Sequence, residues 1–213
     1  MTEWTQRAHV LADHAVSGVL GHVSSLHFDT MSELLWVGSA SGQLTSHTGA
    51  LPTLPRYTSL AAHGAPKQPR HVRGILSDDK FIISLSEGRV CASQRQGLGR
   101  WSMQIEDHAP GVALAGLCAS PQSASSDIIV GGAAPNSHDA LFALHSISGR
   151  VVRSAVSDGT VTQLRKGSRY LCVGTEQGTI QLHDPRSLRA EHKLPAHHGG
   201  LIDLQTDGHL IYS

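Results

Sequence analysis

The sequence predicts an all-β protein, an incomplete β-propeller with about four and a half blades of an expected seven. Three observations predict this. Five segments each open with an aliphatic residue and another three positions later, starting at residues 23, 72, 114, 161 and 201. The 213 residues include 22 glycines and only 16% are charged, which favours turns and short strands over surface helices. Short apolar runs follow each opening pair. A period of about forty residues built from β-like runs is typical of a propeller, with four strands per repeat.

The first element of each repeat is a strand that carries the aliphatic pair. The pairs are Val23/Leu26, Val72/Ile75, Leu114/Leu117, Val161/Leu164 and Leu201/Leu204. A polar turn follows in four repeats, because Asp, Gly and Ser bond to the local backbone or relax its φ. These turns are Asp29-Thr30, Ser77–Asp79, Lys166–Ser168 and Thr206–Gly208.

The second element is a dense apolar run, which predicts a strand buried on both faces. The runs are Leu34–Val37, Phe81–Leu85, Ile128–Val130 and Tyr170–Val173. The third element is a strand that follows Gly42, Gly88 or Gly178, where glycine permits the positive φ of a tight hairpin. In the third repeat, Leu141 takes the equivalent place after Asp139.

The fourth element is a more polar outer strand. We expect it at Arg56–Leu60, Gly99–Ile105, Arg150–Val156 and Leu188–Leu194. The repeats therefore extend over about 23–60, 72–108, 114–157, 161–196 and 201–213, within one domain of residues 1–213. The alternative is chance alternation in a glycine-rich sandwich, which five ordered occurrences disfavour.

The two ends of the chain suggest an opened ring. Leu210–Ser213 resembles the buried strand of the fifth repeat without its outer strands, and His9–Val16 resembles an outer strand without a blade. We therefore expect a propeller truncated at its C-terminus, the N-terminal part of a longer protein.

Composition excludes several classes of protein. Seventeen basic and seventeen acidic residues give no net charge to attract nucleic acid or a membrane. The three cysteines are far apart and lack CxxC spacing. The start lacks a signal peptide, and no apolar run approaches the roughly 18–20 residues of a membrane span. We expect a soluble intracellular protein with no membrane partner.

No residue pattern predicts catalysis or a cofactor. Among fifteen histidines, the adjacent pair His197-His198 has no ligand at metal-site spacing, and no GxSxG nucleophile motif occurs. The cysteines lie in or beside apolar runs, where thiols are unreactive. The acid pairs Asp78-Asp79 and Glu106-Asp107 fall in turns. We expect no catalytic residue, metal, cofactor or small-molecule substrate.

One region is a candidate for binding. Arg56, Lys67, Arg70 and Arg73 occur with Tyr57, two histidines and no acid. Such a patch suits phosphates of RNA or an acidic partner. The alternative is a solvated loop, since phosphate binding normally requires several converging basic groups.

The repeats resemble degenerate WD40 units. Gly21-His22 stands where a WD40 repeat has Gly-His, with weaker echoes at Ala62-His63, Asp107-His108 and Ala196-His197. Only His183-Asp184 approaches the Trp-Asp that ends the third strand, and His47, Ser93 and Leu144 stand at the other Trp positions. The structural repeat signature is therefore Gly21, His22, Gly42, Gly88, Gly178, His183 and Asp184.

A closer resemblance covers nearly the whole chain from Val23. Phe28–Ser46, Val72–Ser86 and Leu171–Ser187 resemble the N-terminal WD40 domain of the catalytic subunit of the fungal poly(A)-nuclease (PAN) deadenylation complex. The resemblance implies a longer parent protein. Its further parts would be a linker that binds a pseudokinase-containing regulatory subunit, an inactive ubiquitin-hydrolase-like domain and a metal-dependent 3′–5′ exoribonuclease domain.

By that resemblance, this chain is a non-catalytic platform that docks the regulatory subunit and mRNA coated with poly(A)-binding protein. It would act in the cytoplasm, with P-bodies as a specific site. Two alternatives stay open: a segment that contributes directly to RNA cleavage, and a WD40 adaptor unrelated to deadenylation that scaffolds protein complexes.

Overall fold

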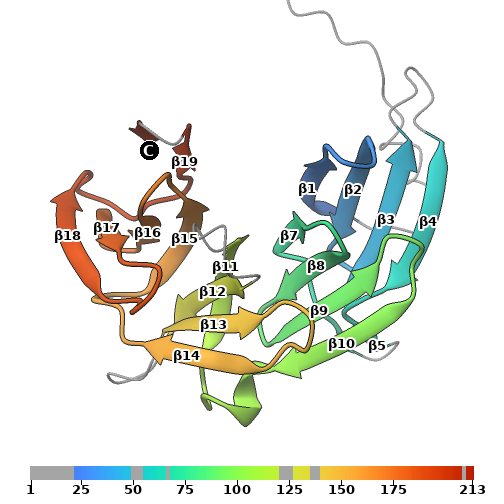
Figure 1. The fold of residues 1–213 in the computed structure, drawn as a ribbon, viewed down its shortest axis with the longest axis horizontal. Coiled ribbons are helices and arrows are strands. Elements are labelled where there is room, and N and C mark those ends of the chain that lie inside the picture. Colours follow the sequence, from blue (N-terminus) through green and yellow to red (C-terminus); the bar gives the residue numbers. More distant parts are fainter. Residues whose placement is uncertain (1–21, 49–54, 66–67, 120–126, 135–139, 208–209) are drawn as a thin grey trace, which may run out of the picture. The chain divides into compact units, whose positions relative to one another are not determined.

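The computed structural model describes residues 22–48, 55–65, 68–119, 127–134, 140–207 and 210–213. It contains four four-stranded sheets (Figure 1), with strand orders β1-β2-β3-β4, β10-β9-β8-β7, β11-β12-β13-β14 and β15-β16-β17-β18. Two further two-stranded sheets are β5-β6 and β19-β20. The pairs β1–β2, β7–β8, β12–β13 and β16–β17 are antiparallel, as expected for consecutive strands joined by short turns.

The strands of the first two large sheets are β1 (Val23–Asp29), β2 (Leu34–Ser39), β3 (Gln43–Thr48), β4 (Arg56–Ala61), β7 (Gly74–Ser77), β8 (Phe81–Ser86), β9 (Arg89–Gln94) and β10 (Gly99–Gln104). Those of the next two are β11 (Ala113–Ala119), β12 (Asp127–Ala133), β13 (Leu141–His145), β14 (Val151–Ala155), β15 (Val161–Lys166), β16 (Leu171–Thr175), β17 (Thr179–His183) and β18 (Ala190–Pro195). The short strands are β5 (Gly64–Ala65), β6 (Gln68–Pro69), β19 (Gln205–Thr206) and β20 (Ile211–Tyr212), and one 3₁₀ turn spans Ile105–Asp107.

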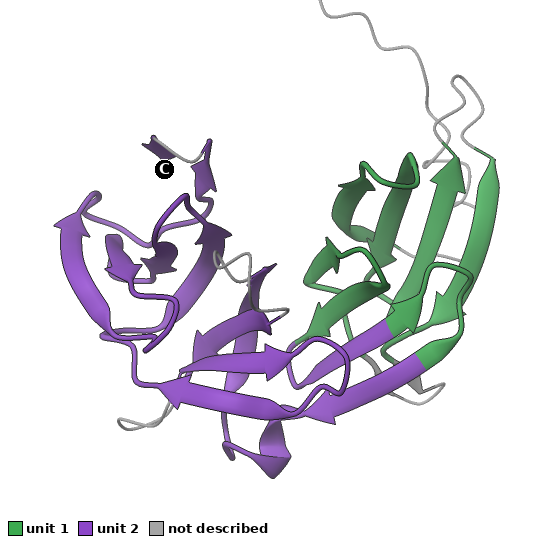
Figure 2. Ribbon diagram, viewed as in Figure 1, with its two compact units in different colours: residues 1–86, 93–99 green, residues 87–92, 100–213 purple. Residues whose placement is uncertain are grey.

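The chain forms two compact units (Figure 2). Unit 1 comprises residues 1–86 and 93–99, and unit 2 comprises residues 87–92 and 100–213. In the part of the chain that the structure describes, no helix has the length and apolar character needed to span a bilayer.

Each unit has its own apolar core. In unit 1, Leu34, Trp36, Leu44 and Ile82 pack together, with Trp36 fully buried. In unit 2, residues of the third large sheet, such as Ile129 and Leu141, pack against Leu164 and Val173 of the fourth. The dense apolar runs form β2, β8, β12 and β16, and every residue of β8 and β16 is buried. The strand type predicted for these runs is confirmed.

A hydroxyl contact recurs at the start of the sheets. Ser24 Oγ donates to the carbonyl oxygen of Val72 over 2.8 Å in unit 1. Thr162 Oγ1 donates to the carbonyl oxygen of Leu201 over 2.8 Å in unit 2. Both donors stand one residue after the opening aliphatic residue of their repeat, and both acceptors open the next repeat. In each case the hydrogen bond joins two successive repeats.

The turn glycines follow the prediction in two cases out of three. Gly42 and Gly178 have φ of +82° and +77°, but Gly88 is not among the residues with positive φ. The connection between β8 and β9 is one residue shorter than the connections that contain Gly42 and Gly178, so Gly88 occupies a different position in its turn.

Two other expectations need correction. Leu210–Ser213 was expected as a buried strand, but Leu210 and Tyr212 are 58% and 53% exposed, because β19 is the one partner of β20 among the described residues. Leu188 was expected in an outer strand, but it is fully buried in a turn with φ of +57°, and β18 begins at Ala190. His9–Val16 lies outside the described residues.

Candidate interaction surface

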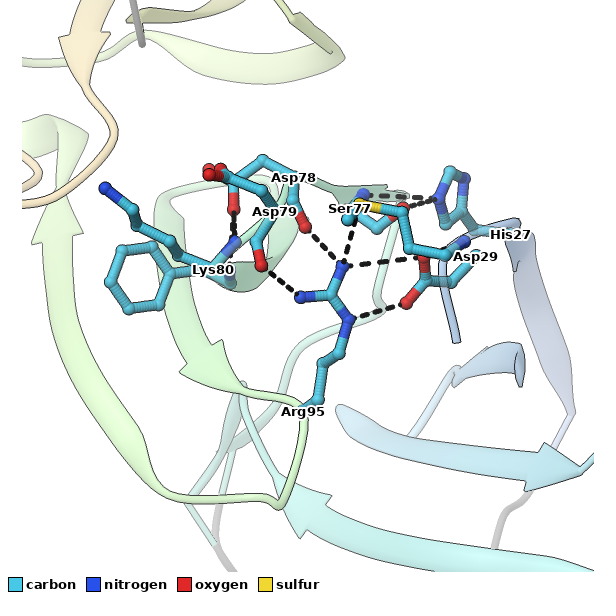
Figure 3. Close-up of polar contacts among 9 residues, drawn as sticks. His27, Asp29, Ser77, Asp78, Asp79, Lys80 and Arg95 are labelled. Carbon is cyan, nitrogen blue, oxygen red and sulfur yellow. Dashed lines mark hydrogen bonds and ion pairs between the residues drawn. The ribbon is translucent and has the colours of Figure 1, made fainter. Parts of the chain in front are cut away.

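The side chain of Arg95 forms hydrogen bonds with two other segments of unit 1 (Figure 3). Its Nε donates to Asp29 Oδ2 over 2.8 Å, and its Nη1 donates to the carbonyl oxygen of Asp79 over 2.8 Å. Its Nη2 donates to the carbonyl oxygen of Asp78 and lies 4.0 Å from Met31 Sδ. One guanidinium therefore joins the turn after β1, the turn after β7 and the loop after β9.

Local turn chemistry positions these acceptors. Asp78 Oδ1 accepts the N–H groups of Lys80 and Phe81 over 2.7 and 2.6 Å, which fixes the turn between β7 and β8. Asp29 Oδ1 accepts the N–H of Met31 over 3.1 Å. Burial raises the pKa of Asp29, but the hydrogen bonds from Arg95 and Met31 and the charge of Arg95 outweigh it and leave the pKa below its usual value.

His27 lies beside this cluster (Figure 3). Its Nε2 lies 2.7 Å from Ser77 Oγ and accepts the N–H of Ser77 over 3.2 Å. Burial lowers the pKa of His27, and the nearby Asp29 opposes that effect only partly. A neutral imidazole is the form that can accept the Ser77 N–H. These hydrogen bonds hold the turns of unit 1 in place.

The pairing of strands in the first sheet separates two members of the predicted basic patch, Arg56 and Arg73. Arg56 pairs with His47, which pairs with Leu35 near the start of β2. Arg73 follows Val72, whose N–H donates to the carbonyl oxygen of Ser39 at the far end of β2. Four residues of strand separate Leu35 from Ser39, roughly 13 Å. Arg56 and Arg73 therefore lie at opposite ends of the first sheet.

The other members of the patch are Arg70 and Lys67. Arg70 is exposed, like Arg56 and Arg73. Lys67 lies outside the described residues, as does Gly21 of the repeat signature.

Histidines occupy buried structural positions in both units. His63, from the Ala62-His63 echo, is 3% exposed and its Nε2 lies 2.9 Å from Ser84 Oγ. His22 is exposed, and its carbonyl oxygen accepts the N–H of Ala40. At the Trp position of β3, His47 is fully buried with Nε2 3.2 Å from Thr45 Oγ1.

His183 and Asp184 shape the turn between β17 and β18. His183 is fully buried, with Nδ1 2.8 Å from the carbonyl oxygen of Leu188 and Nε2 2.9 Å from Gln181 Oε1. Burial lowers the pKa of His183, the bond to Leu188 raises it and the charge of Lys193 lowers it, with a net decrease. Asp184 accepts bonds from Ser187 Oγ and from the N–H groups of Ser187 and Arg186, which lower the pKa of its carboxyl.

This turn also carries basic side chains that the sequence analysis did not single out. Arg186 and Arg189 come from the β17–β18 turn, Arg169 comes from the β15–β16 turn, and Lys166 is the last residue of β15. All four are exposed. The signal in the sequence was two basic pairs, Lys166 with Arg169 and Arg186 with Arg189. It was missed because a turn was predicted only for the first pair, at Lys166–Ser168, while Leu188–Leu194 was expected to be a strand.

The family model described as "PAN2 N-terminal" matches residues 8–213 of the chain. The catalytic subunit of the PAN2–PAN3 deadenylation complex from Aspergillus oryzae is 32% identical over 88% of this chain and 15% of its own length. The Schizosaccharomyces pombe subunit is 31% identical over 90% of the chain and 16% of its own length. The human subunit is 30% identical over 93% of the chain and 15% of its own length. The chain therefore spans about a sixth of the curated relatives it matches.

Solved structures give the same assignment. The Neurospora crassa Pan2 WD40 domain superposes with a TM-score of 0.76 at 27% identity, covering 90% of this chain and 55% of that one. The WD40 propeller of Doa1 superposes with a TM-score of 0.67 at 14% identity, covering 87% of this chain and 58% of that one, which supports the fold alone. The all-β prediction and the predicted resemblance are confirmed. The chain belongs to the PAN2 N-terminal family and is a partial WD40-type β-propeller.

Proposed function

We propose that this chain is a non-catalytic propeller platform that supports mRNA poly(A)-tail shortening. It would dock the pseudokinase-containing regulatory subunit and mRNA coated with poly(A)-binding protein. The observation that carries the proposal is the family match over residues 8–213, together with relatives named as catalytic subunits of PAN2–PAN3 deadenylation complexes. The family match also disfavours an adaptor unrelated to deadenylation.

The state of the acidic residues supports a platform. A nuclease that uses metal ions needs carboxylates that are free to converge on them. The carboxylate of Asp78 instead fixes a turn, and that of Asp184 accepts three bonds within its own turn. Glu106 Oε2 accepts the N–H of Gly111. These carboxylates shape the backbone.

The cysteines support the same conclusion. Burial raises the pKa of Cys91 to about 11 and that of Cys118 to about 12, and it raises the pKa of Cys172 as well. A thiol needs its thiolate form to act as a nucleophile. The exonuclease chemistry of the full-length protein would then belong to a metal-dependent domain outside this chain, and no cofactor is proposed here. We place the activity in the cytoplasm, including P-bodies.

Two measurements on the purified chain test the proposal. Biolayer interferometry would measure binding to the regulatory subunit and to poly(A) coated with poly(A)-binding protein. We expect saturable binding to at least one of them. A poly(A) degradation assay with Mg²⁺ would show no shortening. Degradation by the chain alone, or no binding to either partner, would refute the platform.

A further inference from the structure

Two hairpin turns lie at the same end of the β15–β18 sheet. The register aligns Lys166 with Leu171, Leu171 with His183, and His183 with Ala190. The turn over residues 167–170 and the turn over residues 184–189 therefore project from the same end of the sheet. Side chains from both turns share one surface.

That surface is basic. Lys166, Arg169, Arg186 and Arg189 are all exposed, and within the described residues no ion pair involves any of them. The β17–β18 turn contains one carboxylate, that of Asp184, and it accepts three hydrogen bonds from residues of the same turn. Cations therefore outnumber the carboxylate, although the chain as a whole has no net charge.

An aromatic group lies beside the cations. Arg169 Cζ lies 5.2 Å from the centroid of the Tyr170 ring, and His192 meets the same ring edge-on with centroids 5.8 Å apart. Arg169 and Tyr170 also line a cavity of about 330 Å³, with Cys172 and Leu182 among its apolar lining residues. The nearby Asp207 uses its carboxylate to accept bonds from Leu210 and Tyr212.

We propose that this end of the β15–β18 sheet binds single-stranded nucleic acid. Lys166, Arg186 and Arg189 would contact phosphates, and a base would stack on Arg169 and Tyr170 at the cavity. Single strands are bound in this way, by a basic track combined with planar groups that accept an unpaired base. This inference deepens the proposed function, because it gives the platform a direct contact with RNA.

Other ligands match the surface less well. A duplex offers phosphates but keeps its bases stacked and unable to enter the cavity. An acidic peptide without aromatic residues offers negative charge but no planar ring for Tyr170. The aromatic group and the cavity therefore favour a single strand, and the other two ligands are tested as competitors.

Fluorescence anisotropy with a fluorescein-labelled 20-nucleotide oligoadenylate tests the inference on the purified chain. Three or four phosphate contacts predict a slope of about −2 to −3 for log K against log salt concentration, since each contributes about −0.7. The double substitution Arg186→Glu/Arg189→Glu should weaken binding at least about tenfold and flatten the slope. Tyr170→Ala should weaken it about tenfold, and Tyr170→Phe should leave it nearly unchanged.

The matched control is Arg100→Glu/Arg150→Glu. These two arginines are exposed, belong to unit 2 and lie outside the β15–β18 sheet, and their reversal changes the net charge equally. The control should bind like the parent chain, and melting temperatures should show that all variants are folded. Equal losses in both double variants would overturn the inference.

Competition gives a second way to overturn it. An equally strong effect of a 20-residue polyglutamate, together with unchanged binding by Tyr170→Ala, would indicate an acidic protein partner. Equal competition by an RNA duplex would exclude single-strand recognition. Either outcome leaves the docking of the regulatory subunit untouched, so it is distinguishable from failure of the proposed function.

Discussion

Arg95 Nε lies 2.8 Å from Asp29 Oδ2, and the carboxylate of Asp29 is fully buried while Arg95 is 18% exposed. The two residues are 66 positions apart in the sequence. The same guanidinium bonds the carbonyl oxygens of Asp78 and Asp79, so removing it would leave three acceptors without this donor. Arg95 therefore connects the turn after β1 and the turn after β7 to the loop after β9.

Breaking this pair should destabilise the chain strongly. Arg95→Met leaves the Asp29 carboxylate buried without its partner, and we expect a loss of about 3–5 kcal/mol in the free energy of unfolding. Urea denaturation monitored by circular dichroism measures it. The control is Lys193→Met, which breaks the exposed ion pair with Asp158 and should not change the unfolding midpoint measurably. Equal midpoints for both variants would contradict a structural role for Arg95.

The sequence predicted the regular part of this fold and missed its long-range polar contacts. The aliphatic pairs and dense apolar runs predicted β2, β8, β12 and β16, because burial imposes a period on the sequence. The contact between Asp29 and Arg95 leaves no local pattern, since the two residues are 66 positions apart. The same limit applied to the basic patch. Arg56 and Arg73 lie at opposite ends of a sheet, while Arg169 and Arg186, which have the same separation of 17 positions in the sequence, lie at the same end of one sheet.

Acid should lower the free energy of unfolding in two separate pH ranges. The pKa values of His27 and His183 are lowered in the folded state, so the unfolded chain takes up protons first as the pH falls below about 6.5. Their contribution to stability is present above that pH and is lost as the pH falls toward their folded pKa values. The lowered pKa of Asp29 contributes stability that is present above about pH 4, near the ordinary value of 3.8, and is lost below it.

The measurement for these two ranges is the free energy of unfolding from pH 8 to pH 3. His183→Gln should reduce the slope between pH 6.5 and 4 and leave the slope below pH 4 intact. Asp29→Asn should do the reverse. A parent curve that stays flat between pH 6.5 and 4 would show that the buried histidines do not contribute.

The cysteine thiols should resist modification in the folded chain. Cys91, Cys118 and Cys172 are buried, and burial raises the pKa of each thiol. At pH 8 we expect Ellman's reagent to react with them only slowly, and to react with all three within seconds to minutes in denaturant. Rapid reaction of one thiol under native conditions would identify a locally open segment or a reactive cysteine.

Replacing Gly178 with a residue that has a Cβ atom should destabilise the chain. Its φ of +77° disfavours other residues, and a Cβ atom there would lie 2.3 Å from the carbonyl oxygen of Gly199 and 2.4 Å from that of His197. Left-handed backbone alone costs a residue with a Cβ about 1–2 kcal/mol, and the backbone clash adds to that. Gly178→Ala should therefore lower the free energy of unfolding by more than about 1 kcal/mol.

The matched control is Gly99→Ala, because an added Cβ at Gly99 meets no atom within 4 Å. Its backbone is not in the left-handed region, since Gly99 is not among the glycines with positive φ. Thermal unfolding of the two variants should differ by several degrees, with Gly99→Ala close to the parent. Similar midpoints for both would mean that the turn containing Gly178 can shift without cost, and that this glycine does not fix the hairpin between β16 and β17.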